Sequence, residues 1–227
     1  MSQLNLTLNQ SPTIHTAYGD ITLDPLRDIL IIPPNTSVQT LPLSIPWSGR
    51  VWARQFCSSR GDNCLLGDCG SSSCLHSSSA STTLFEMTVL EADNMNYDIS
   101  LVDAYTMGLT AIPHHESCTT ISCQVPPFLG LDKAGKPICP SENMIHLPVS
   151  DTSRHFLNDV YGCLSDCSLY HEAQACCAGI FQYPCTCMPS NPWFKEVCPG
   201  VYSYAYDDLA GHQSCPLSNI SLVFSCI

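Results

Sequence analysis

The chain has 227 residues, only 12% of them charged, and a formal net charge of −12. A chain this acidic repels phosphate backbones and has no electrostatic attraction to anionic membranes, so we expect no nucleic-acid partner. A neutral polysaccharide or a cationic partner fits this charge better. No stretch approaches the roughly 18 apolar residues of a membrane span, so none is expected.

Residues 1–28 carry no basic region followed by an apolar core and no small-residue cleavage site. No signal peptide is therefore visible in this chain. We predict that this segment is an alternative or mis-assigned start, and that it contributes no strand to the main fold.

From residue 29 onward the pattern is mostly β. Short segments rich in β-branched and aromatic residues are bounded by Pro, Gly or Asn, which is typical of strands. Such spacing, without helical patterns in between, predicts a β-sandwich or a barrel. The predicted strands are Ser37–Ile45, Arg50–Phe56, Leu84–Leu90, Tyr97–Val102 and Ile220–Phe224.

All sixteen cysteines follow position 56, and they include the adjacent pair Cys176 and Cys177. An even, dispersed set of this kind indicates a disulfide framework formed in an oxidising compartment. No C-x-x-C pair of the kind that zinc favours occurs, so we expect neither a metal site nor a cofactor. The cysteine-dense middle of the chain predicts a small lobe held by disulfides, with short helices at Thr152–Tyr161 and Leu169–Ala178.

A series of motifs runs in order from about residue 29 to the end of the chain. They include WSGRVWARQFC (Trp47–Cys57), CLLGDCGSSSC (Cys64–Cys74), YDISLVDAY (Tyr97–Tyr105), FKEVCPGVYSYAYDD (Phe194–Asp208) and VFSC (Val223–Cys226). Their order and spacing resemble those of the thaumatin-like proteins of plant defence.

This resemblance implies a mainly β fold, an antiparallel β-sandwich with a disulfide-rich lobe of loops and short helices. The sandwich would comprise residues 29–122 and 199–227, and the lobe residues 123–198. Residues 1–28 would form an atypical segment, because they lack the first strand of the family and its cysteine. A monomer is expected.

The resemblance also implies a disulfide pairing. Cys177 would pair with either Cys185 or Cys187, and the sequence does not separate these alternatives. Cys226 lacks its family partner. The other implied pairs are Cys57–Cys64, Cys69–Cys74, Cys118–Cys215, Cys123–Cys198, Cys139–Cys163 and Cys167–Cys176.

The resemblance further implies that five charged residues converge in a cleft between the sandwich and the lobe: Arg50, Glu86, Asp98, Asp103 and Asp207. Without it, these would be an ordinary surface charge, outward strand residues and a turn residue. Asp98 and Asp103 are five residues apart, so an unbroken strand would point them to opposite faces. Convergence therefore requires a bulge or a strand end between them.

The implied function is defence against fungi through binding of β-1,3-glucan, with Asp98 and Asp207 accepting hydrogen bonds from sugar hydroxyls. One alternative is an endo-β-1,3-glucanase with Glu86 as the acid and Asp103 as the nucleophile or base, since paired carboxyls carry out glycoside hydrolysis. In that case Arg50 would keep one carboxylate ionised. The other alternative is an inhibitor of a microbial enzyme.

Three Asn-x-Ser/Thr sequons support a secretory route, at Asn5, Asn35 and Asn219. We expect a secreted glycoprotein that carries glycans at Asn35 and Asn219. The resemblance implies a location in the apoplast or the vacuole.

Overall fold

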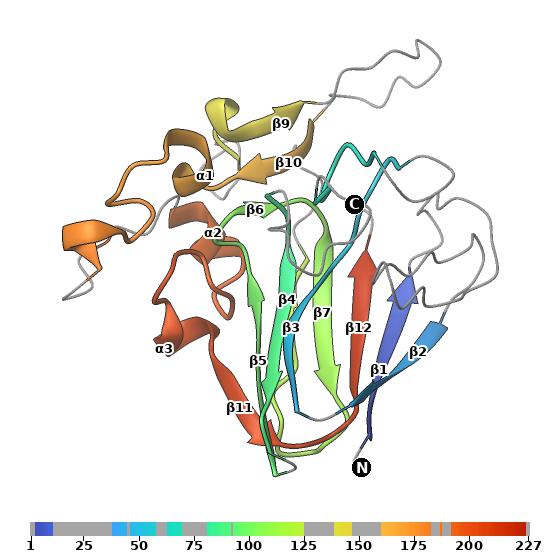
Figure 1. Cartoon of the computed structure of the whole chain (residues 1–227). Helices are drawn as coiled ribbons and strands as arrows, with labels where there is room; N and C mark the ends of the chain where they lie inside the picture. The colour runs from blue at the N-terminus through green and yellow to red at the C-terminus, as the bar shows by residue number, and fades with distance from the viewer. Residues whose placement is uncertain are drawn as a thin grey trace.

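Two β-sheets pack face to face and form the main body of the molecule (Figure 1). The computed structural model describes residues 3–10, 38–44, 46–57, 63–69, 81–91, 93–124, 139–146, 160–182, 187 and 192–225.

The first sheet has five strands in the order β2-β1-β12-β7-β8. Strand β1 pairs in parallel with β12 and antiparallel with β2, and the remaining pairs are antiparallel. The strands are β1 (Gln3–Gln10), β2 (Val38–Ser44), β7 (Gly108–Pro113), β8 (Ile121–Cys123) and β12 (Ile220–Ser225).

The second sheet has four strands in the order β11-β5-β4-β3, all antiparallel. They are β3 (Trp47–Trp52), β4 (Leu84–Val89), β5 (Asn94–Ser100) and β11 (Gln213–Pro216).

The core lies between the two sheets, because alternate residues of facing strands are buried there. In β4, Phe85, Met87 and Val89 are buried, whereas Glu86 and Thr88 between them are partly exposed. Such alternation is the pattern of a strand with one face on the core. Strand β12 shows the same alternation, with Leu222 fully buried opposite that sheet.

The lobe contains a small sheet of its own, in the order β6-β10-β9 (Figure 1). Its strands are β6 (Ala104–Tyr105), β9 (Met144–His146) and β10 (Val160–Leu164). The helical elements are short: η1 (Ser141–Asn143), α1 (Asp166–Tyr170), η2 (Gly179–Phe181), α2 (Pro192–Val197) and α3 (Asp208–Gly211). Ser165 caps α1 by accepting a hydrogen bond from the Ser168 amide.

Every cysteine that the structure describes is disulfide-bonded. Cys177 pairs with Cys187, one of the two alternatives left open by the sequence. Cys74, Cys185 and Cys226 lie outside the described residues, and so does the partner of Cys69. The other bridges are Cys57–Cys64, Cys118–Cys215, Cys123–Cys198, Cys139–Cys163 and Cys167–Cys176, the pairs that the resemblance implied.

The prediction of a mainly β, antiparallel sandwich is confirmed, but two local predictions are wrong. Residues 1–28 do supply a strand, β1, which lies between β2 and β12 inside the first sheet. The overlooked signal is the alternation of Leu with polar residues in QLNLTLNQ, a period-two strand pattern.

The helices predicted in the lobe also differ. Val160 and Tyr161, expected at the end of a helix, belong to strand β10. Residues 152–159, the rest of that prediction, lie outside the described residues. The second predicted helix, Leu169–Ala178, is replaced by α1, which begins earlier and ends at Tyr170. The sequence pattern missed both because the bridges at Cys163, Cys167 and Cys176 direct the local backbone.

Candidate functional site

Three charged residues form a row across the outer face of the second sheet. Arg50 of β3 lies directly opposite Glu86 of β4, and Glu86 lies directly opposite Asp98 of β5. Directly paired residues of neighbouring strands point to the same face. The flanking Phe85 and Met87 point into the core, so the row lies on the face away from it.

Arg50 and Glu86 are an ion pair, with 3.7 Å between Arg50 Nε and Glu86 Oε1. Both side chains keep contact with solvent, at 46% and 38% exposure. Exposed pairs of this kind add little stability. Their arrangement instead offers a hydrogen-bond donor and an acceptor side by side to a ligand.

Asp103 joins the row from the turn after β5. The strand ends at Ser100, and Asp103 immediately precedes β6, so a strand end does separate Asp98 from Asp103. The Ser165 amide donates a hydrogen bond to the Asp103 carbonyl over 2.9 Å, which ties this turn to the lobe.

Asp103 interacts electrostatically with Arg50 and Glu86. Partial burial raises the pKa of Asp103, and the Arg50 guanidinium partly offsets this. Burial likewise raises the pKa of Glu86, with Arg50 lowering it and the negative charge of Asp103 raising it further.

Asp98 is the most strongly perturbed carboxyl of the row. Burial, followed by the negative charges of Glu86 and Asp208, raises the pKa of Asp98 to about 7. Its Oδ1 atom is buried and has no hydrogen-bond partner among the described residues. A carboxyl so placed is protonated over the mildly acidic range, where it can donate a hydrogen bond.

Tyr202 and Asp208 extend the row beyond Asp98. The Tyr202 hydroxyl donates to Asp208 Oδ1 over 2.6 Å. The Tyr202 backbone is held beside the end of β5 by hydrogen bonds with Ile99 and Leu101. Burial and the neighbouring carboxylates raise the pKa of Tyr202. Our sequence interpretation placed neither residue in the site, although the YDD stretch that contains Asp208 was the available signal.

Asp207 lies near this row, but its side chain is buried, whereas Arg50 and Glu86 are in contact with solvent. It is only 5% exposed, and its Oδ2 accepts hydrogen bonds from the amide and the hydroxyl of Ser203. Lys195 Nζ of α2 lies 2.5 Å from the same oxygen. Asp207 therefore fixes the turn before α3, whereas we had expected it to accept hydrogen bonds from a sugar.

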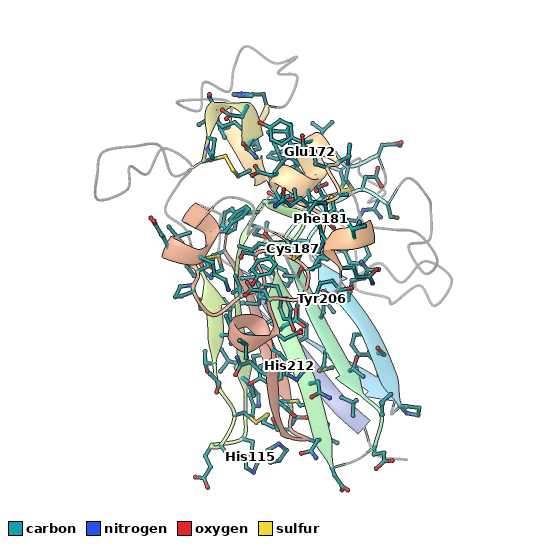
Figure 2. The ribbon with its side chains drawn as sticks, turned by 90° about the vertical axis from the view of Figure 1, so that its left-hand side faces the viewer. His115, Glu172, Phe181, Cys187, Tyr206 and His212 are labelled. Atoms are coloured by element: carbon teal, nitrogen blue, oxygen red, sulfur yellow. A yellow bond between two sulfur atoms is a disulfide. The ribbon has the colours of Figure 1, made fainter. Side chains whose placement is uncertain are left out.

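We define the acidic row as Arg50, Glu86, Asp98, Asp103 and Asp208. The lobe flanks its Asp208 end, where Gln182 Nε2 donates to the Tyr206 hydroxyl over 2.8 Å. Figure 2 shows Phe181, Cys187 and Tyr206 gathered on this side of the molecule.

The acidic row suits recognition or protonation of a neutral polyhydroxylated ligand. Carboxylates accept hydrogen bonds from hydroxyls, Arg50 donates, and a carboxyl with a raised pKa can supply a proton. Within the described residues, no cluster of three or more His, Cys, Asp or Glu side chains is arranged to hold a metal ion. No helix in the described part of the chain is long and apolar enough to cross a membrane.

Comparison with known proteins matches this chain to the thaumatin family, whose family model covers residues 28–226. Pathogenesis-related protein 5 of Arabidopsis thaliana is 35% identical over 78% of this chain and 71% of its own length. A protein of Prunus avium named glucan endo-1,3-beta-glucosidase is 32% identical over 77% of the chain and 69% of its own length. A PR5-like receptor kinase of Arabidopsis thaliana is 35% identical over 71% of the chain, which spans 24% of that protein.

The sandwich and its bridged lobe are thus those of a thaumatin-like, pathogenesis-related type of protein. The chain belongs to the thaumatin family.

Proposed function

We propose that this protein binds a neutral β-1,3-glucan through the acidic row and acts in antifungal defence. The observation that supports this most is the cross-strand register Arg50–Glu86–Asp98, which gathers a guanidinium donor and two carboxyl groups in one row on the outer face of the sheet. The net charge of −12 favours a neutral ligand over a polyanion.

A second candidate function is hydrolysis of the same glucan. A relative from Prunus avium carries the name glucan endo-1,3-beta-glucosidase, and the pKa of Glu86 is raised as a general acid requires. In this mechanism Glu86 would protonate the leaving oxygen and Asp103 would act as the nucleophile or base. Carboxyl separations of about 5–5.5 Å suit retention, and separations of about 6.5–9.5 Å suit inversion.

Two assays on soluble laminarin-type glucan distinguish these functions: direct binding, and release of reducing ends. Binding without turnover supports the first proposal. Turnover that Glu86→Gln abolishes supports hydrolysis. If the protein shows neither binding nor turnover, both proposed functions are overturned, and inhibition of a microbial enzyme remains as the hypothesis.

A matched control is Glu116→Gln, which changes an exposed carboxylate in the turn between β7 and β8. Figure 2 shows its neighbour His115 at the end of the molecule opposite the lobe residue Glu172. We expect Glu116→Gln to retain wild-type glucan binding and Asp103→Asn to weaken it about tenfold, which corresponds to about 1.4 kcal/mol.

We also propose that the protein is a secreted, monomeric glycoprotein. Its disulfide bridges are of the kind that persists in oxidising compartments. Asn219 is exposed in the turn between β11 and β12, a position open to a glycan. Asn35 lies outside the described residues.

A further inference from the structure

Phe56 has a backbone conformation that its side chain disfavours. Its φ is 55°, in the left-handed region, where a bulky residue is an outlier. Burial of the side chain does not explain why a phenylalanine has this backbone conformation, because Phe56 remains 43% exposed. Strained residues of this kind cluster at ligand-binding sites, where the strain holds a group in place.

Tyr161 meets Phe56 from the lobe and also sits at a backbone irregularity. The pairing of β10 with β9 shifts register between Val160 and Gly162, so Tyr161 occupies a bulge. Bulges re-aim side chains and occur next to functional sites. The next residue has to be small, since a Cβ atom on Gly162 would approach the Tyr105 carbonyl oxygen to 2.9 Å.

The two rings form an edge-to-face pair with centroids 5.2 Å apart and planes at 85°. In such a pair the edge of one ring covers one face of the other, and the remaining ring faces stay free of this contact. The tyrosine adds a hydroxyl to the two apolar rings. This combination suits a sugar ring, which has an apolar face and a hydroxylated rim.

The aromatic pair is tied to the Asp103 end of the acidic row. Gln55, the neighbour of Phe56, donates from Nε2 to the Thr106 carbonyl over 3.2 Å. Thr106 is three residues from Asp103 in sequence, so the Cα atoms of Thr106 and Asp103 are at most about 10 Å apart even in an extended chain. A linear polymer bound at Asp103 can therefore reach the rings.

We propose that Phe56 and Tyr161 form an aromatic subsite that stacks one sugar ring of a linear neutral glucan, next to the acidic row. This inference rests on the proposed glucan binding and assigns a chain-length requirement to it. A long oligosaccharide occupies both the row and the rings, whereas a short one occupies the row alone.

The test is calorimetric titration of a short and a long linear β-1,3-glucan oligosaccharide into the full chain and its variants. We expect Phe56→Ala and Phe56→Gly to weaken binding of the long oligosaccharide about tenfold, equivalent to about 1.4 kcal/mol. Binding of the short one should change less than about twofold. Tyr170→Ala, which removes another exposed aromatic side chain (52%), should change neither affinity.

The glycine variant separates binding from folding. Glycine adopts a left-handed backbone without strain, so Phe56→Gly should keep the melting temperature at or above that of Phe56→Ala while binding equally weakly. Wild-type affinity for the long oligosaccharide in both Phe56 variants overturns the subsite and leaves glucan binding standing. A wild-type protein that binds neither oligosaccharide overturns both proposals.

Discussion

Asp98 and Asp207 show how burial separates two acidic side chains that look alike in the sequence. Asp207 accepts hydrogen bonds from Ser203 and forms an ion pair with Lys195, so its buried Oδ2 atom has partners. Asp98 has a buried oxygen without a partner among the described residues and carboxylates on both sides. Its charged form is therefore disfavoured.

The first prediction concerns the pH dependence of stability. Because the pKa of Asp98 is about 7 in the fold and about 3.8 in the unfolded chain, the folded state holds one more proton between these values. This contribution to stability is complete below about pH 4 and is lost as the pH rises through 7, at a cost of up to about 4 kcal/mol. Asp98→Asn, which resembles the protonated acid, should be more stable than wild type at pH 8 and similar at pH 4.

Urea unfolding of both proteins at these two pH values measures the difference. Glu116→Gln serves as the control, since it alters an exposed carboxylate whose charge is not among those that raise the pKa of Asp98, and it should show no such divergence. If Asp98→Asn shifted stability by the same amount at both pH values, the raised pKa would not be the cause.

The sequence named Glu86, Asp98 and Asp103 as candidates, but only through the motifs of the family. Strand periodicity alone cannot show that Glu86 faces Arg50 and Asp98, because register depends on how the strands pair. Asp207 and Asp208 are adjacent, and their order in the sequence does not show which one is buried. In the structure the buried Asp207 accepts a hydrogen bond from Ser203, and the exposed Asp208 accepts one from Tyr202.

Among the elements, β1 departs furthest from what we predicted. It is an interior strand, with Leu6 paired to Ile220 of β12 and to Leu41 of β2. Its partner β2 is an edge strand and contains Pro42, as edge strands tolerate. Strands β1 and β2 are both distant from β12 in the sequence, so the local pattern alone could not assign this pairing.

The second prediction tests β1 directly. Leu6→Pro removes a backbone N–H from an interior strand, which should lower the free energy of unfolding by about 2–3 kcal/mol. Amide hydrogen exchange should show protection of residues 3–10 in the wild-type protein and its loss in the variant. Rapid exchange of residues 3–10 in the wild-type protein, or no loss of stability in the variant, would contradict their place within the sheet.

For the whole molecule, two long-range disulfides connect separate parts of the fold. Cys118, shortly before β8, is bonded to Cys215 of β11, so this bridge joins the two sheets. Cys123 of β8 is bonded to Cys198, just after α2, and joins the first sheet to the lobe. These long-range bridges hold the outer face of the second sheet and the lobe in one arrangement, on which the acidic row and the aromatic pair both depend.

The last prediction compares a long-range bridge with a local one. Cys118–Cys215 closes a loop of 97 residues, whereas Cys57–Cys64 closes one of 7. Because the entropy that a bridge removes from the unfolded chain grows with loop length, replacing the first pair by alanines should cost about 5 kcal/mol and the second about 2 kcal/mol. Guanidinium unfolding of the two double variants measures both costs. Equal costs would mean that native-state contacts at each bridge, and not the constraint on the unfolded chain, determine how these disulfides stabilise the fold.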